Sequence, residues 1–451
     1  MHAQFRSLAD ADPHAAALID GESGAVTTRA MLLARADALA VELAASGLRA
    51  RDAVAIQLPN SVDFVAALLA AAKLDLVVVP IDRDAPESEV ATILGHFAVR
   101  GLVYHAGRGV TSLSTRATHE RPHVPAEARL IKLTSGSTGK PKGIVTSEAN
   151  LVADAMQICG TMEIHPSDLN LGAIPFSHSY GFSNLVMPLL VQGTPVVFSN
   201  DYLPQALIEL ANRYRCTVAP LIPMVFEHLA STGGSSPFST VRTFLSAGAP
   251  LAASTSRKFR ERFGRDIHSF YGCSECGGIT YDRRGGAVER GTVGAAMDGV
   301  TLSIERARLT IHSDSVALGY LFDATTFEPF TGGAFRSDDL VELRDGELAL
   351  TGRAGELINT AGKKVNPREV EAVILQLEGV REAKVYGEPA GARGEVVAAA
   401  IVATPNVTRE QVREFCRARL SLHKVPRIVK LIDRMPRDER GKLKRALLAE
   451  L

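Results

Sequence analysis

The sequence has little of several features that would narrow its class at once. It has no excess charge of either sign, because Lys plus Arg and Asp plus Glu each number 50. Composition therefore gives no argument for a nucleic acid or an acidic membrane surface as a partner. Cysteine is scarce, and five residues in a chain of 451 is a low and odd count that suits a reducing cytosol.

Long apolar runs are also absent. No hydrophobic stretch is long enough to span a bilayer, and the opening residues MHAQFRSLADADPH lack the charged start and apolar core of a secretory signal. We therefore expect a cytoplasmic protein without a membrane span. The hydrophobic share of 46% and the charged share of 22% are those of an ordinary globular protein, and the length predicts two or three lobes.

Helix and strand patterns alternate through the first part of the chain. Residues 27–46 repeat apolar side chains at every third and fourth position and predict a helix. Residues 52–58, 75–81 and 169–176 predict strands. Alternation at this pace predicts an α/β fold with a mostly parallel sheet and helices on its faces.

The pattern changes after about residue 300. Two segments look like hairpins, one with Asp345 and Gly346 as its tight turn. Farther along, residues 366–378 and 408–420 predict helices on either side of two strands. These elements are enough for a small α+β lobe of its own.

The segment IKLTSGSTGKPKG at 131–143 places glycines and hydroxyls before two lysines, a composition typical of a phosphate site. It is not a Walker loop, because Thr134 stands where the first glycine is needed and Pro141 where the magnesium-binding hydroxyl is needed. A Gly/Ser-rich surface linker is the alternative interpretation. We favour a mobile loop that wraps a polyphosphate, with Lys142 supplying charge.

This loop resembles the phosphate loop of the adenylate-forming superfamily, which contains acyl-CoA synthetases, free-standing adenylation domains and luciferases. The resemblance implies that six loop residues contact the phosphates of ATP: Thr134, Ser135, Gly136, Ser137, Thr138 and Gly139.

Companion segments follow in the family's order over nearly the whole chain. In IPFSHSYGFSN, His178 matches a residue that borders the carboxylate pocket. LSAGAPL resembles the turn that lies along the adenine, and the matching residues are Gly248, Ala249 and Pro250.

The segment YGCSECGG resembles the family's Tyr-Gly-x-Thr-Glu motif. The resemblance implies that Tyr271, followed by Gly272, stacks on adenine. It implies in the same way that Ser274 contacts the α-phosphate and that Glu275 holds magnesium. Ser274 replaces the usual threonine but keeps its hydroxyl.

Three further positions match toward the C-terminus. Asp339 in FRSDDL matches the aspartate that binds both ribose hydroxyls, and Arg353 matches a residue that reaches ribose or phosphate. Lys442 in RDERGKLKR matches the lysine that enters the active site. Gly355 departs from the family, in which an aspartate or lysine is common at this pivot.

The family's architecture completes the expected fold. We expect a large N-terminal domain at 1–352, with layered, mostly parallel sheets, flanking helices and a small β-barrel-like part. A hinge at 353–356 would connect it to a small, mobile C-terminal α+β domain at 357–451.

The implied reaction activates a carboxylic acid. The acid attacks the α-phosphorus of ATP, releases pyrophosphate and forms acyl-AMP, and Mg²⁺, Lys142 and Lys442 offset the repulsion between the two anions. A thiol then takes the acyl group. The cofactors are ATP, Mg²⁺ and coenzyme A, or the phosphopantetheine arm of an acyl carrier protein. A luciferase-like oxygenase and a non-catalytic nucleotide-binding relative remain alternatives.

The acid itself is less well defined. Amino-acid-activating members carry an aspartate where this chain has Ser177, His178 and Ser179, so an α-amino acid is disfavoured. The expected lining is mostly apolar and favours a fatty, aryl or arylalkenoic acid. It comprises Phe182, Asn184, Met224, Val225 and Cys276.

Cys273 and Cys276 form a Cys-x-x-Cys motif, but no second pair exists to complete a zinc site. We therefore expect both thiols to line the acyl pocket or to pack beneath it.

Overall fold

The computed structural model describes residues 1–106, 111–116, 120–135, 141–231, 238–360, 363–389, 395–437 and 447–448. The described chain divides into two compact units. The larger comprises Met1–Ser303, Ile311–Phe335 and Asp345–Leu348, and the smaller comprises Ile304–Thr310, Arg336–Arg344 and Ala349–Leu451. The architecture confirms the predicted α/β class.

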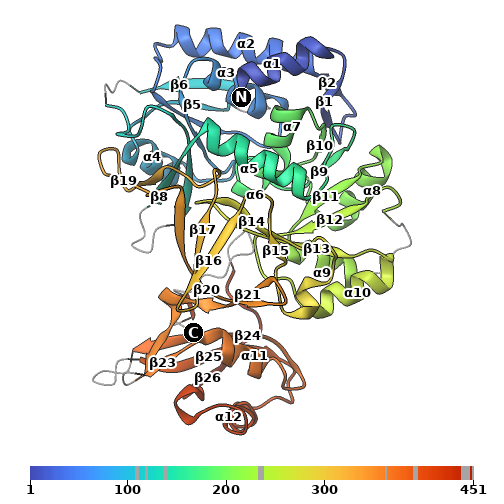
Figure 1. Cartoon of the computed structure of the whole chain (residues 1–451), viewed down its shortest axis with the longest axis vertical. Helices are drawn as coiled ribbons and strands as arrows, with labels where there is room; N and C mark the ends of the chain where they lie inside the picture. The colour runs from blue at the N-terminus through green and yellow to red at the C-terminus, as the bar shows by residue number, and fades with distance from the viewer. Residues whose placement is uncertain are drawn as a thin grey trace. The chain divides into compact units, whose positions relative to one another are not determined.

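The larger unit contains a nine-stranded sheet (Figure 1). Its central run β13-β12-β11-β9-β10-β1 is parallel throughout, and β14, β15 and β2 add antiparallel edges. In sheet order the strands are β15 (Ala295–Ala296), β14 (Gly277–Tyr281), β13 (Ile267–Cys273), β12 (Thr243–Ser246), β11 (Val218–Leu221), β9 (Asn170–Gly172), β10 (Val196–Phe198), β1 (Ala16–Asp20) and β2 (Val26–Thr28).

A second, eight-stranded sheet lies in the same unit. Here β7, β4, β3 and β5 run parallel, and β8, β18, β19 and β6 pair antiparallel. In sheet order the strands are β19 (Phe327–Pro329), β18 (Gly319–Leu321), β8 (Pro141–Ser147), β7 (Ala128–Ser135), β4 (Val77–Pro80), β3 (Ala53–Gln57), β5 (Val99–His105) and β6 (Thr111–Thr115).

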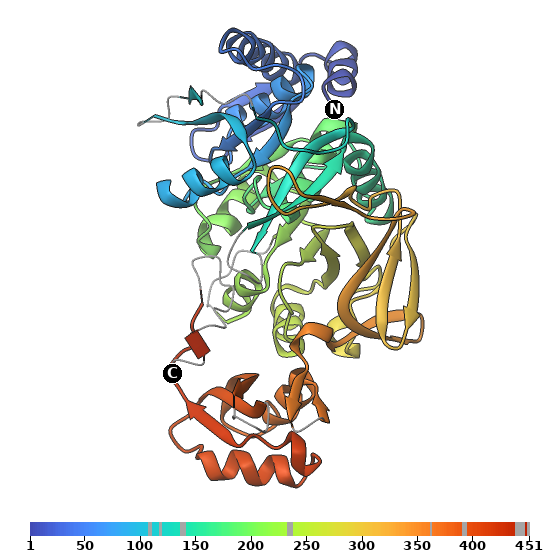
Figure 2. The ribbon, with the colours of Figure 1, turned by 90° about the vertical axis from the view of Figure 1, so that its left-hand side faces the viewer.

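Helices cover these sheets. Helices α1 and α2 lie together at the top of the unit in both views (Figures 1 and 2). Helix α3 is buried along eight consecutive residues, Phe64 to Ala71, as expected of a helix that is apolar on every face. The helices are α1 (His2–Ala11), α2 (Arg29–Ala45), α3 (Val62–Lys73), α4 (Glu87–His96), α5 (Glu148–Thr161), α6 (Ser179–Gly181), α7 (Met187–Gln192), α8 (Pro204–Tyr214), α9 (Pro223–Ser231) and α10 (Ala253–Phe263), with a π-helix at Phe182–Val186 and a 3₁₀ turn at Ala287–Arg290.

The smaller unit is built on the three-stranded sheet β24 (Val380–Pro389), β25 (Glu395–Ala403) and β26 (Ile428–Leu431). Helices α11 (Pro367–Ile374) and α12 (Arg409–Arg417) supply Ile374 and Val412 to its own apolar core. Short 3₁₀ turns lie at Ala354–Glu356 and Leu422–Lys424, and β22 (Ile358–Thr360) pairs with β23 (Lys363–Val365).

A further four-stranded sheet has strands divided between the two units. Its order is β16-β17-β20-β21, so the expected barrel-like part is an open sheet in the described chain. The strands are β16 (Thr301–Glu305), β17 (Arg308–His312), β20 (Ala334–Arg344) and β21 (Glu347–Arg353). Asp345 and Gly346 both have positive φ, at 50° and 80°, which confirms the predicted tight turn.

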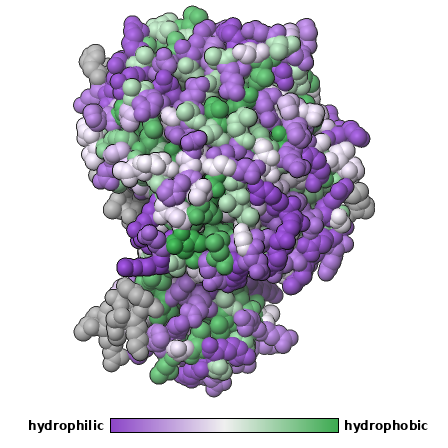
Figure 3. All heavy atoms as spheres, in the orientation of Figure 1, coloured by the Kyte–Doolittle hydropathy of each residue, from purple (hydrophilic) through white to green (hydrophobic). Residues whose placement is uncertain are grey.

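The surface mixes polar and apolar side chains over the face of the larger unit shown in Figure 3. None of the described helices is long and apolar enough to cross a membrane.

Candidate active site

The β7–β8 hairpin positions the first predicted phosphate ligands. Thr134 pairs with Lys142 and Ser135 with Pro141 in the antiparallel register. The Thr134 hydroxyl donates to the Lys142 backbone oxygen at 3.3 Å, which links the ends of the two strands.

Several predicted residues lie outside the described part of the chain. They are Gly136, Ser137, Thr138, Gly139 and Lys442, together with the side chain of Ser135.

Tyr320, which belongs to none of the sequence motifs, contacts both Lys142 and Glu275. The Lys142 ammonium lies 3.3 Å from the centre of the Tyr320 ring, a close cation–π contact. The Tyr320 hydroxyl donates to Glu275 Oε1 at 2.9 Å. The Glu275 backbone oxygen accepts from Ala317 N at 2.8 Å, so both the backbone and the carboxylate of Glu275 are positioned.

Ser274 is held beside the segment that carries His178. Its hydroxyl lies 2.9 Å from the Ser179 hydroxyl. His178 is the N-cap of α6, and its Nδ1 accepts from Tyr180 N at 3.2 Å, which orients the imidazole. The π-helix Phe182–Val186 follows, and such irregular turns often occur at functional sites.

The turn that follows β12 and the last residues of β13 contain the residues predicted to contact adenine. These two parallel strands are neighbours, so their carboxyl ends bring Gly248, Ala249 and Pro250 to the same sheet edge as Tyr271. Gly248 has φ +85°, a conformation that favours glycine. A side chain at Gly272 would lie 2.4 Å from the Gly277 carbonyl oxygen, so only glycine fits there.

A buried carboxylate is hydrogen-bonded to the start of β14. Asp154 on α5 accepts from the Ser183 hydroxyl at 2.6 Å and from Gly278 N at 2.9 Å. It thereby connects the π-helix to the strand that follows Glu275. Nothing in the sequence signals this role, because Asp154 belongs to none of the recognised motifs.

Asp339 and Arg353 belong to the smaller unit. Arg353 Nε lies 3.0 Å from Asp339 Oδ1, and the Ser337 hydroxyl accepts from Asp339 N at 3.0 Å. The Asp339 side chain is only 12% exposed, whereas that of the neighbouring Asp338 is 63% exposed and pairs with Arg308. Strand alternation therefore separates the two acids and leaves Asp339 as the oriented one.

The predicted acid-binding residues divide by exposure. Phe182, Asn184, Val225 and Cys276 are buried, but Met224 is 57% exposed. The buried Asn184 Oδ1 accepts no hydrogen bond from the described residues.

Magnesium chemistry fits the described donors. Mg²⁺ is commonly held by one or two carboxylates and by substrate phosphates. Glu275 can supply such a carboxylate, and the described residues contain no cluster of three or more metal-binding side chains that would hold an ion without substrate.

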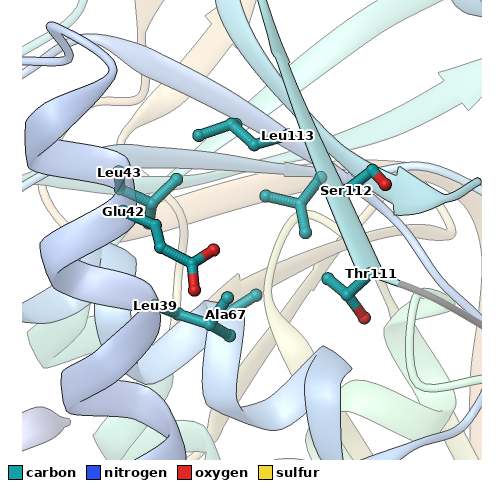
Figure 4. Close-up of a pocket in the computed structure, with 8 residues that line it drawn as sticks. Leu39, Glu42, Leu43, Ala67, Thr111, Ser112 and Leu113 are labelled. Carbon is teal, nitrogen blue, oxygen red and sulfur yellow. The ribbon is translucent and has the colours of Figure 1, made fainter.

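Two hollows lie away from the predicted residues. One lies between α2, α3 and β6, and its lining includes Leu39, Glu42 and Leu43 from α2 and Leu113 from β6 (Figure 4). The other follows the carboxyl ends of β3 and β5 and is lined by Gln57, Pro59, Arg83, Asp84, Tyr104 and His105. None of the predicted site residues within the described ranges contributes to either hollow.

Comparison with known proteins identifies the family. A family model for AMP-binding enzymes matches residues 5–321, and a model for the AMP-binding enzyme C-terminal domain matches residues 369–442. The chain belongs to the AMP-binding enzyme family. This confirms the adenylate-forming superfamily and the enzyme class of AMP-forming acid–thiol ligases.

Relatives extend over almost the whole chain. The long-chain-fatty-acid–CoA ligase FadD13 of Mycobacterium tuberculosis is 26% identical, covering 99% of this chain and 97% of its own length. The sulfoacetate–CoA ligase of Cupriavidus necator is 28% identical, with 96% and 94% covered. A feruloyl-CoA synthase from a Streptomyces species is 26% identical, also with 96% and 94% covered.

Solved structures share the fold. ATP-bound MatB from Rhodopseudomonas palustris superposes with a TM-score of 0.86 at 24% identity, covering 100% of this chain and 98% of its own. The o-succinylbenzoate coenzyme A synthetase MenE from Bacillus subtilis, in complex with ATP and magnesium ion, gives a TM-score of 0.83 at 24% identity, with 99% and 98% covered.

Proposed function

We propose that this AMP-binding enzyme uses ATP to convert a carboxylic acid to acyl-AMP and then transfers the acyl group to coenzyme A. The contact chain from Lys142 through Tyr320 to Glu275 is the observation that carries the proposal. It joins a cation suited to phosphate with a carboxylate suited to magnesium, and catalysis of this type depends on charge stabilisation and alignment.

The remaining roles follow the family positions. Magnesium held by Glu275 and the ATP phosphates would neutralise charge on the leaving pyrophosphate. Ser274 would contact the α-phosphate, and its link to Ser179 aims the hydroxyl. Asp339 presents acceptor oxygens to the ribose hydroxyls and Arg353 orients it. His178 would border the acid, and Tyr271, Gly272, Gly248, Ala249 and Pro250 would form the adenine site.

For the acid, we propose a fatty, aryl or arylalkenoic substrate. Buried Phe182 and Val225 supply apolar surface. The amide oxygen of Asn184, which has no hydrogen-bond partner among the described residues, can accept from a substrate hydroxyl. The relatives named for long-chain fatty acids and for feruloyl groups fit this class.

A second substrate class is favoured by Lys132. This lysine is only 7% exposed, and no carboxylate of the described residues forms an ion pair with it. Lys132 on β7 lies opposite Ile144 on β8, and Ile144 lies opposite Tyr320 on β18. Residues opposite one another point to the same face of a sheet, so Lys132 and Tyr320 share a face and lie roughly 10 Å apart.

The Lys132 side chain could pair with a second anionic group on the acid. A relative named for sulfoacetate would be consistent with such a substrate.

One panel of acids tests the proposal and separates the two classes. Purified protein, ATP and Mg²⁺ are supplied with fatty, aryl, arylalkenoic, dicarboxylic and sulfo acids, and AMP and acyl-CoA are measured after coenzyme A is added. We expect at least one acid to give both products in equal amounts. If a dicarboxylic or sulfo acid is best, Lys132→Met should raise its KM far more than that of an apolar acid. If no acid yields AMP, the proposal fails.

The acceptor is tested in the same assay. Coenzyme A and a phosphopantetheinyl carrier protein present the same thiol. If the acyl group is transferred to a carrier protein but not to coenzyme A, the proposed acceptor is wrong.

Lys442 provides a separate prediction. Lys442→Ala should nearly abolish acyl-AMP formation, because it removes a cation from the anionic transition state. Ready-made acyl-AMP should still be transferred to coenzyme A by the variant. Acyl-AMP formation at the wild-type rate in Lys442→Ala would exclude this role.

A further inference from the structure

The turn between β13 and β14 contains two thiols in contact. Cys273 ends β13 and Cys276 precedes β14, and their sulfur atoms are 3.0 Å apart. A disulfide would need an S–S distance of about 2.05 Å, so the two sulfurs must approach by only about 1 Å. Both thiols are free in the structure.

The residues between the two cysteines are Ser274 and Glu275, to which we assign contacts with ATP and magnesium. The Ser274 hydroxyl lies 2.9 Å from that of Ser179, and Glu275 Oε1 accepts from Tyr320 at the same distance. Any tightening of the turn therefore acts directly on both side chains.

Hydrogen bonds hold the surrounding backbone on both sides of the turn. The Cys276 carbonyl accepts from the Ser315 hydroxyl at 2.8 Å, and the Glu275 carbonyl accepts from Ala317 N at 2.8 Å. Cys273 pairs with Gly277 in the hairpin. With the turn fixed on these sides, the displacement falls on the side chains of Ser274 and Glu275.

We propose that Cys273 and Cys276 form an oxidation site, at which a peroxide produces an intrachain disulfide that displaces Ser274 and Glu275 and reversibly stops acid activation. The effect on activity rests on the proposed function. Formation of the disulfide does not.

The chemistry balances with one peroxide for each pair. Cys273 is partly exposed and attacks the peroxide, which breaks the O–O bond and gives a sulfenic acid and water (or an alcohol from an organic peroxide). Cys276, which is fully buried beside it, then attacks the sulfenic sulfur, forms the S–S bond and releases water. Two thiols are oxidised, and a dithiol reductant reverses the change.

The other three cysteines are more isolated. Cys159, Cys216 and Cys416 are 4%, 0% and 0% exposed, and burial raises the pKa of Cys159 and Cys216 to about 12.

Peptide mapping tests the site without relying on activity. Intact protein is incubated with hydrogen peroxide, alkylated and digested. The mass of the peptide that contains both cysteines is then measured by mass spectrometry. We expect it to lose two hydrogens and to resist alkylation until dithiothreitol is added. If both thiols remain alkylatable after prolonged exposure to peroxide, the oxidation site does not exist.

Activity is measured on the same samples by ATP–pyrophosphate exchange. We expect the disulfide form to lose at least about tenfold in rate, since a misplacement of about 1 Å at a reacting group can cost more than that, and dithiothreitol should restore it. Cys273→Ser, compared with its own untreated rate, should keep its exchange after peroxide. Cys416→Ala retains the pair and should remain sensitive.

Two results would overturn the link to activity. One is a fully formed disulfide with unchanged exchange. The other is an equal loss in Cys273→Ser, which would mean that peroxide acts elsewhere. If no acid supports exchange even in the reduced protein, the proposed function has failed, and peptide mapping still decides whether the pair is oxidised.

Discussion

At the scale of single residues, the role of Glu275 depends on its neighbours more than on its own chemistry. A carboxylate in a tight turn can adopt several rotamers, and each ordered rotamer has an entropic cost. The Tyr320 hydroxyl at 2.9 Å selects one of them, and the Tyr320 ring holds the Lys142 ammonium at 3.3 Å. One aromatic residue thus aligns two charges of opposite sign.

Replacement of Tyr320 by Phe should separate these two effects. The variant keeps the ring beneath Lys142 but loses a hydrogen bond to a carboxylate, which contributes about 1.5–3 kcal/mol. We expect a several-fold rise in the Mg²⁺ concentration required for half-maximal acyl-AMP formation, measured by magnesium titration.

Tyr320→Leu is the matched control, because it removes both the ring and the hydroxyl. It should lower the rate further and also weaken ATP binding through Lys142. Identical magnesium titrations for wild type and Tyr320→Phe would show that the hydroxyl does not orient Glu275.

The sequence predicted Lys142, Ser274 and Glu275 because each lies in a motif with a recognisable order of residues. Tyr320 lies in no such motif. Its contact with Glu275 spans 45 residues and arises only because β18 pairs with β8 in a register that sets Tyr320 opposite Ile144. Register between distant strands is not visible in a single sequence.

At the scale of secondary-structure elements, the helices with strong caps agree with prediction. Helix α2 begins after Thr28, whose hydroxyl accepts from Met31 N, and α12 begins with a capping box at Thr408. The strand expected at 169–176 is wrong in extent, because only Asn170–Gly172 is extended. Ile174 and Phe176 are buried outside the strand, and an apolar pattern reports burial rather than strand geometry.

Strand β21 begins with Glu347, whose carboxylate makes the free energy of unfolding depend on pH. The Arg290 guanidinium, with help from Thr292 and Arg284, lowers the pKa of Glu347 from its ordinary 4.5 to about 2. A depressed pKa means that the stabilisation is complete above about pH 4.5 and is lost as the pH falls toward 2.

Glu347→Gln should therefore lower stability by about 1 kcal/mol at pH 7, since its arginine partners are partly exposed. The difference from wild type should shrink between pH 4.5 and pH 3, as measured by urea midpoints. Glu342→Gln removes an exposed acid paired with Arg344 and should change little at either pH. A difference that stays constant with pH would contradict the assignment.

At the scale of the whole molecule, the two units have separate apolar cores. In the larger unit, one core surrounds Phe226, Phe244 and Phe259, whereas the smaller unit has its own around Ile374 and Val412. Separate cores are what a swivelling C-terminal domain requires. We propose a hinge at 353–356 between domains at 1–352 and 357–451, with motion between the two half-reactions. These bounds differ from the two compact units, in which Asp339 and residues 349–352 belong to the smaller one.

Gly355 tests the hinge. An added Cβ there would contact nothing within 4 Å, so Gly355→Ala should behave almost as wild type. Gly355→Pro restricts the backbone and should slow thioester formation by about tenfold or more while acyl-AMP formation continues. Single-turnover kinetics separate the two steps. Equal rates of thioester formation in the proline and alanine variants would place the hinge elsewhere.

The most direct measurement is exchange of labelled pyrophosphate into ATP in the absence of any thiol. Exchange requires that the enzyme form acyl-AMP reversibly from the acid and ATP, and it depends on neither the acceptor nor the domain motion. With a broad panel of organic acids, Mg²⁺ and reduced protein, we predict exchange that depends on one class of acid and is lost in Glu275→Ala and Lys142→Ala. No exchange with any acid, or exchange that is unaffected in both variants, would contradict the account.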